Sequence, residues 1–264
     1  MTPHNTNSVS AKIRLFQLIA LAVCAVFLVV AGQQLLKHRA GIFKRARPLM
    51  APLQVIFRYF DFNERTALKQ WEEKTFRGQV HYWIDFDKTN GFVHSKSKDA
   101  SSAIFYRLKF DAYQYPYLAW KWRIGTFPDK KGSQDPKKRD DFAARVYVVF
   151  VSHFFTNFHC VEYVWDESIP AGTILASPYS DQIKLLVVQS GTDKNWAVEK
   201  QNIIEDYQKL FGRKPKMKVA AIALMTDSEG TGSEAEGFFD DIQIGGIKLG
   251  HNEPATNPTD APSH

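Results

Sequence analysis

The sequence predicts an all-β protein: an antiparallel β-sandwich of the jelly-roll or galactose-binding-like type, with one or two inserted helices and a preceding N-terminal transmembrane or signal helix. Seven or more short runs alternate apolar and polar residues with a period of two, as half-buried strands do. Aromatic residues make up 14% of the 264 residues, which suits the core of a sheet protein. The runs do not alternate with helices, so an α/β fold is disfavoured.

The first element is an apolar run at residues 15–32, LFQLIALAVCAVFLVVAG, interrupted only by Gln17. Its length is about that of a helix crossing a bilayer. We therefore expect a short N-terminal tail at 1–14 and a transmembrane or signal-anchor helix at 15–36.

The charges beside this run allow two orientations. Lys12 and Arg14 precede it, and a larger group follows it: Lys37, Arg39, Lys44, Arg45 and Arg47. The positive-inside bias would leave the following domain in the cytoplasm, whereas a short tail before a large domain suits export, and large domains can translocate despite charge. The sequence favours export, and a cytoplasmic domain and a cleaved signal peptide both remain open.

Residues 37–57 predict a basic juxtamembrane linker, suited to an anionic lipid surface or to solvent. The segment 250–264 is rich in Pro, Asn and Thr and has no apolar period, which predicts disorder. The sandwich is therefore expected over 58–249.

Within that domain, alternation predicts strands at 102–110, 117–124, 142–150, 161–165, 183–190, 219–226 and 238–244. In the run 117–124, Trp120 and Trp122 fall on one face and Lys121 and Arg123 on the other. A helix is expected at 198–212, ended by Gly212, and a short helix at 64–71.

Charged residues enter the buried-looking segment RDDFAARVYVVF at 139–150, which opens with Asp140 and Asp141 and carries Arg145 in its middle. If the runs at 117 and 142 are neighbouring strands, their polar residues share one face of the sheet, opposite the tryptophans. Acidic residues at the strand ends would then lie between the lysine and arginine side chains on that face. This face would be a polar groove that hydrogen-bonds a sugar. Alternatively, planar Arg–carboxylate pairs hold strand ends in register. The candidate ligand-binding residues are Lys121, Arg123, Asp140, Asp141, Arg145, Tyr147, Asp227 and Asp241.

Catalytic and metal chemistry have weaker support. Glycoside hydrolysis would need two facing carboxylates, such as Asp141 with Asp227 or Asp241. No nucleophile elbow, P-loop or HExxH motif is present, so no catalytic residue is assigned. The acidic turn at 226–241 offers oxygen ligands for calcium but lacks the EF-hand order, so no cofactor is expected and calcium remains a weak alternative. The basic clusters lack interleaved aromatics, which disfavours nucleic acid as a partner.

Several motifs together resemble a bacterial family catalogued as domain of unknown function 3047. They are the Trp120–Arg123 strand, the Asp140–Val148 strand, the Met225–Gly232 turn and the ending Asp241–Ile242. The resemblance covers about residues 60–245. It implies export and supplies no activity. At Glu229 this chain departs from the Asn or Asp common in the family. FDFNE and FFDDIQI also give a looser, fold-level similarity to jelly-roll carbohydrate-binding modules.

These observations together favour a binding protein over an enzyme. We expect a module tethered to the bacterial inner membrane, facing the periplasm, that binds a glycan or another component of the cell envelope. An enzyme acting on envelope polysaccharide and a non-catalytic scaffold for an envelope assembly are the alternatives.

Overall fold

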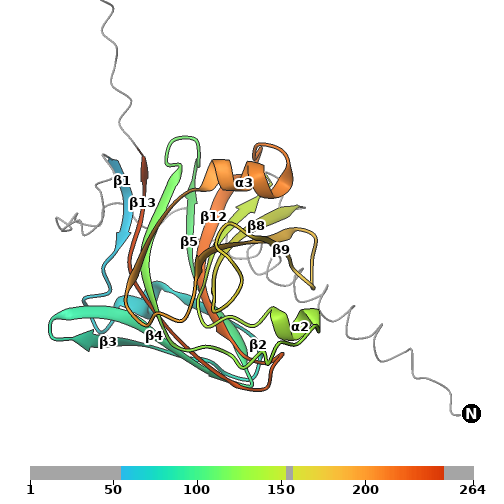
Figure 1. The fold of residues 1–264 in the computed structure, drawn as a ribbon. Helices are drawn as coiled ribbons and strands as arrows, with labels where there is room; N and C mark the ends of the chain where they lie inside the picture. Colours follow the sequence, from blue (N-terminus) through green and yellow to red (C-terminus); the bar gives the residue numbers. More distant parts are fainter. Residues whose placement is uncertain (1–54, 153–156, 247–264) are drawn as a thin grey trace, which may run out of the picture.

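The computed structural model describes residues 55–152 and 157–246, which form two β-sheets packed face to face (Figure 1). The six-stranded sheet has the order β11-β6-β13-β4-β3, and β1 pairs with the remaining length of β13. Its strands are β1 (Val55–Phe60), β3 (His81–Asp87), β4 (Asn90–Lys98), β6 (Tyr117–Thr126), β11 (Ala197–Asn202) and β13 (Glu234–Gly246).

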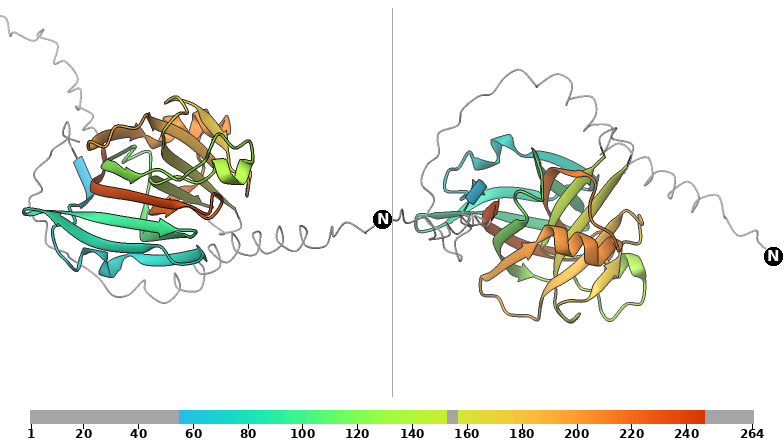
Figure 2. Two further views of the ribbon diagram at one scale, coloured as in Figure 1. Left: turned by 60° about the horizontal axis from the view of Figure 1, so that its bottom comes forward. Right: turned by 90° about the horizontal axis from the view of Figure 1, so that it is seen from above.

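The seven-stranded sheet has the order β2-β5-β12-β7-β8-β10-β9. Its strands are β2 (Glu72–Arg77), β5 (Ser101–Phe110), β7 (Arg145–Val151), β8 (Phe158–Asp166), β9 (Ile174–Ala176), β10 (Ile183–Ser190) and β12 (Lys218–Asp227). Figure 2 shows the two layers from two further directions. The predicted all-β sandwich is confirmed.

One pair of strands departs from the predicted antiparallel arrangement. β10 runs parallel to β8, with Ile183 opposite Cys160, while the other described pairs are antiparallel. The segment between them carries the chain back to the starting end of β8, so β10 enters in the same direction. On its return the chain forms β9, which adds an antiparallel strand to the far side of β10.

Alternating side chains fill the core between the sheets, as the sequence predicted. Trp120 and Trp122 of β6 are fully buried and reach aromatic side chains of β8 in the other sheet. The ring centroids of Trp120 and Tyr163 lie 5.2 Å apart, and those of Trp122 and Trp165 lie 5.9 Å apart. Aromatic pairs at such distances add to the free energy gained by burying their area.

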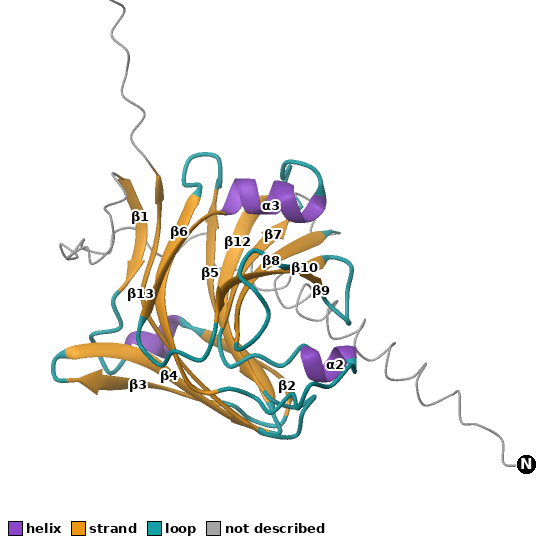
Figure 3. Cartoon of the chain, in the orientation of Figure 1, coloured by secondary structure: helices purple, strands orange, loops and turns teal. Residues whose placement is uncertain are grey.

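The helices are short and lie at the margins (Figure 3). They are η1 (Ala67–Gln70), inside the predicted 64–71 segment, α2 (Pro136–Arg139) and α3 (Ile203–Phe211). The predicted helix at 198–212 starts later than expected, because the backbone of β11 pairs with the edge of β6. Asn202 then caps α3 by accepting from the Ile204 and Glu205 N–H groups, and Gly212 ends it at a φ of +68°.

The strands at 117 and 142, whose adjacency was the condition for one shared polar face, are not neighbours. β6 belongs to the six-stranded sheet and β7 to the seven-stranded sheet. Both turn their apolar faces to the shared core, so their polar faces point to opposite sides of the sandwich. The structure therefore offers two separate polar faces in place of one.

The predicted N-terminal helix at 15–36 and the predicted tail at 250–264 lie outside the described residues. Among the helices of residues 55–152 and 157–246, none has the length and apolar character needed to cross a membrane. The first described strand, β1, starts at Val55, three residues before the predicted start of the sandwich at 58.

Candidate functional site

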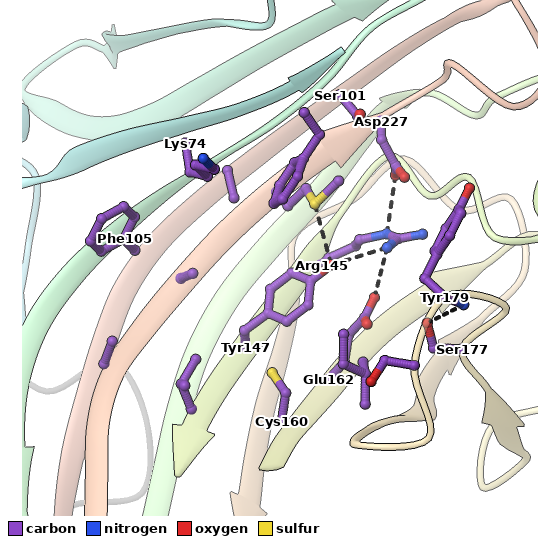
Figure 4. Close-up of a pocket in the computed structure, with 18 of the residues that line it drawn as sticks. Lys74, Ser101, Phe105, Arg145, Tyr147, Cys160, Glu162, Ser177, Tyr179 and Asp227 are labelled. Atoms are coloured by element: carbon purple, nitrogen blue, oxygen red, sulfur yellow. Dashed lines mark hydrogen bonds and ion pairs between the residues drawn. The ribbon is translucent and has the colours of Figure 1, made fainter. Parts of the chain in front are cut away.

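The candidate site lies on the outer face of the seven-stranded sheet, around Arg145 at the start of β7 (Figure 4). β7 is flanked by β12 and β8. Their registers place Met225 of β12 opposite Arg145 and Glu162 of β8 opposite Tyr147. Asp227 ends β12, so acids from both neighbouring strands can reach the guanidinium group.

Three carboxylates surround the Arg145 guanidinium, which is only 3% exposed. Nε lies 3.0 Å from Oδ1 of Asp227, Nη1 lies 3.1 Å from Oε1 of Glu162, and Nη2 lies 3.3 Å from Oδ2 of Asp140. Each guanidinium nitrogen thus faces a different acid. The three acids are themselves buried, so these ion pairs are poorly screened by solvent.

One guanidinium cannot neutralise three buried carboxylates. Burial raises the pKa of Asp140 to about 8, against the opposing effect of Arg145. Burial also raises the pKa of Glu162 and lifts that of Asp227 well above its usual range, again against Arg145. Desolvation of the charged form therefore outweighs attraction to the cation. Burial therefore favours the protonated form of these carboxyls.

Asp141, beside this cluster, binds the turn after β12 rather than Arg145. Its carboxylate accepts hydrogen bonds from the Gly230 N–H at 3.1 Å, the Thr231 N–H at 2.6 Å and the Thr231 hydroxyl at 2.7 Å. These bonds fasten the segment before β7 to the turn after β12. A Cβ at position 230 would lie 2.5 Å from the Lys137 carbonyl oxygen, so the close approach requires glycine.

A cavity of about 180 Å³ opens beside the Arg145 cluster on the outer sheet face. Small and aliphatic side chains contribute much of its lining, and aromatic rings and hydroxyls complete it. The apolar members are Ala103, Val149, Val151, Cys160, Ile183, Ala221, Ala223 and Met225. The aromatic members are Phe76, Phe105, Tyr147, Phe158 and Tyr179, and the remaining polar ones are Lys74, Ser101, Ser177, Ser180 and Glu229. We call this cavity, together with the Arg145 cluster, the groove.

Two tyrosines stand where the apolar lining meets the charged end (Figure 4). The Tyr147 hydroxyl accepts from Nη1 of Arg145 at 3.0 Å and donates to Sδ of Met225 at 3.3 Å. Tyr179 belongs to the segment between β9 and β10. Burial raises the pKa of both phenols, and the carboxylates of Glu229 and Asp140 contribute at Tyr179. Both phenols therefore stay uncharged at neutral pH.

Asp141, Asp227 and Glu229 could hold a metal, since one oxygen of each lies within 4.8 Å of the others. Both oxygens of Asp141 already accept hydrogen bonds from the turn, and Asp227 is paired with Arg145. A calcium ion would have to displace those bonds close to a buried cation. Calcium binding remains a prediction that this donor set supports poorly.

The predicted site residues fall into two groups. Asp140, Arg145, Tyr147 and Asp227 line the groove, and Asp141 lies beside it. The remaining three lie on the other sheet: Lys121 Nζ is 2.7 Å from Oδ2 of Asp241, and the Arg123 guanidinium lies 4.1 Å from the centre of the Phe238 ring.

Three residues of the groove were not among the predicted site residues: Glu162, Glu229 and Tyr179. Glu162 carried a usable signal, because Val161, Tyr163 and Trp165 alternate with it in the strand and leave one acid facing away from the core. Tyr179 carried none, since it lies in an irregular segment that only the tertiary fold brings to the groove.

Comparison with a family model confirms the predicted family resemblance. The model of a family described as protein of unknown function (DUF3047) matches residues 69–243. No curated protein matches the chain in sequence.

Several solved structures similar to the chain are carbohydrate-binding modules. The family 11 module of a cellulosomal cellulase of Clostridium thermocellum has 10% identity and a TM-score of 0.42, covering 76% of this chain and 100% of that one. The mannan-recognising module TmCBM27 has 13% identity and a TM-score of 0.34, covering 74% and 98%. A family 30 carbohydrate-binding module has 11% identity and a TM-score of 0.37, covering 71% and 91%.

Proposed function

We propose that this chain, which belongs to the family described as protein of unknown function (DUF3047), is a module that binds a glycan of the cell envelope in the groove. One observation carries the proposal. A single cavity joins aromatic and aliphatic walls to a buried, charged, hydrogen-bonding end at Arg145. Ligand sites commonly combine a mostly apolar lining with a few fixed polar groups in this way.

Sugar rings have the chemistry that such walls accommodate. Their C–H faces pack on aromatic rings such as Tyr147 and Tyr179, and their hydroxyls both donate and accept hydrogen bonds. The acids around Arg145 provide acceptors, and its three ion pairs hold the guanidinium in place before a ligand arrives. A group fixed in advance loses little conformational entropy on binding.

The proposal includes a location. The apolar run at 15–32 would tether the module to the bacterial inner membrane, and the groove would face the periplasm, where envelope glycans are found. Protease accessibility in spheroplasts tests the orientation, because only a periplasmic domain is digested without breaking the membrane.

A polysaccharide-active enzyme is the second candidate, favoured by the raised carboxyl pKa values. Burial keeps the pKa of Asp140 near 8, so this carboxyl is protonated at neutral pH and resembles a general acid. Release of new reducing ends from a bound glycan would establish an enzyme, and Asp140→Asn should then abolish the release while leaving the glycan bound.

A glycan array probed with the detergent-solubilised full chain tests the binding function. Ala223 lies on the groove floor, so Ala223→Phe should fill the cavity and remove binding. Val198→Phe is the matched control, because Val198 is 52% exposed on the other sheet. If the wild type and Ala223→Phe bind glycan equally, the groove is not the binding site.

A further inference from the structure

The charged side chains that line the groove are unequal in number. Four are acids and two are bases: Asp140, Glu162, Asp227 and Glu229 against Lys74 and Arg145. Of the bases, Arg145 is already matched by an acid at each of its three nitrogens. Lys74 stands apart from it on β2 (Figure 4). The Arg145 end of the groove therefore holds more acidic than basic side chains.

One buried acceptor atom remains open at this end. Oε1 of Glu162 is taken up by its ion pair with Nη1 of Arg145 at 3.1 Å. Oε2 of Glu229, in contrast, is a buried acceptor without a hydrogen-bond partner among the described residues. Buried polar atoms rarely lack a hydrogen bond, because burying such an atom costs desolvation free energy that no bond then offsets.

We propose that the Arg145 end of the groove takes a protonated amine, so that the glycan bound there carries a free amino sugar. This inference rests on the proposed function and names its ligand class. An ammonium group offers hydrogen-bond donors and one positive charge, which match the open Oε2 of Glu229 and the surplus of acidic side chains. The faces of Tyr147 and Tyr179 would add cation–π attraction. A uronate or phosphate would instead meet like charge.

Binding of an amine would exchange a proton for the ligand's charge. Burial raises the pKa of Glu229 as well as those of the acids around Arg145. The other titratable groups lining the groove are Tyr147, Cys160 and Tyr179, two of them phenols with pKa values raised by burial. A cation beside these carboxyls favours their ionised form, so protons leave as the amine enters.

Calorimetry with three matched tetrasaccharides tests the inference on the full chain in detergent. β-1,4-linked glucosamine, N-acetylglucosamine and glucose tetramers differ only at the second carbon. We expect the glucosamine tetramer to bind at least about tenfold more tightly than the other two, as a charged hydrogen bond can provide. Its binding heat should also differ between Tris and phosphate buffers, because the buffer takes up the released proton.

Variants separate the amine preference from glycan binding itself. Glu229→Gln should weaken binding of the glucosamine tetramer several-fold more than binding of the glucose tetramer, and Glu236→Gln on the other sheet should alter neither affinity. Glu162→Gln should act in the same direction if the variant folds. Equal affinity for all three tetramers, or tighter binding of the uncharged ones, overturns the amine inference and leaves the proposed function intact. If none binds, the amine inference falls, and a blank glycan array would remove the proposed function as well.

Discussion

Replacing Arg145 by methionine is the sharpest test of the Arg145 cluster. The substitution keeps most of the side-chain volume and removes the one cation that lies within 3.3 Å of Asp140, Glu162 and Asp227. Removing one partner of a buried ion pair commonly costs about 3–5 kcal/mol, because the remaining charge is left uncompensated.

Proton linkage gives an independent route to that magnitude. The variant cluster loses one positive charge, and the simplest compensation is one additional proton on a carboxyl. Protonating a carboxyl whose ordinary pKa is near 4 costs about 4 kcal/mol at pH 7 and about 1.4 kcal/mol at pH 5. The free energy of unfolding should therefore fall by about 4 kcal/mol at pH 7 and by less than half of that at pH 5.

Urea unfolding of the full chain in detergent, followed by tryptophan fluorescence at both pH values, measures the loss. Arg77→Met is the matched control: its pair with Asp99 spans 3.2 Å but the two side chains are 60% and 51% exposed, so we expect a loss below about 1 kcal/mol. A loss at Arg145→Met no larger than in the control, or equal at pH 5 and pH 7, would refute the reasoning. A stable variant that no longer binds glycan would show that Arg145 serves the ligand alone.

Three further predictions concern the same end of the sandwich. Since burial holds the folded-state pKa of Asp140 near 8, above its unfolded value, the stability of the wild type should fall as the pH rises from about 4 to 8, and Asp140→Asn should flatten that slope in denaturant titrations. Asp141→Asn keeps one of the two accepting oxygens and should cost about 1–3 kcal/mol of unfolding free energy in urea titrations, and wild-type stability of this variant would contradict the role of Asp141 in holding the turn. Calcium should not raise the melting temperature relative to chelator, because the Asp141 oxygens are occupied; a rise that Glu229→Gln abolishes would establish the metal site.

Much of the fold could be predicted because it follows from local features of the sequence, namely the alternation of side chains in strands and the residues that end helices. The alternation in β6 buries Trp120 and Trp122 as predicted, because successive side chains of a strand point to opposite faces. Gly212 ends α3 where predicted, since glycine adopts the positive φ at low cost. The start of α3 was predicted wrongly, because residues 197–202 gain more from pairing with the edge of β6 than from extending the helix.

The groove itself depends on contacts between distant segments. Alternation shows that Arg145 faces away from the core, but it does not say which strands flank β7, and the assumed neighbour β6 proved to lie in the opposite sheet. Tyr179 reaches the groove only because the chain returns beside β8 to start β10 in parallel.

The sequence by itself therefore determined an all-β sandwich, its aromatic core and a set of charged residues facing away from that core. Only the tertiary structure decided that Asp140, Glu162 and Asp227 meet on Arg145, while Lys121 pairs with Asp241 on the other side. The physical reason is that side-chain direction follows from the two-residue period of a strand, whereas strand order follows from packing across the whole domain.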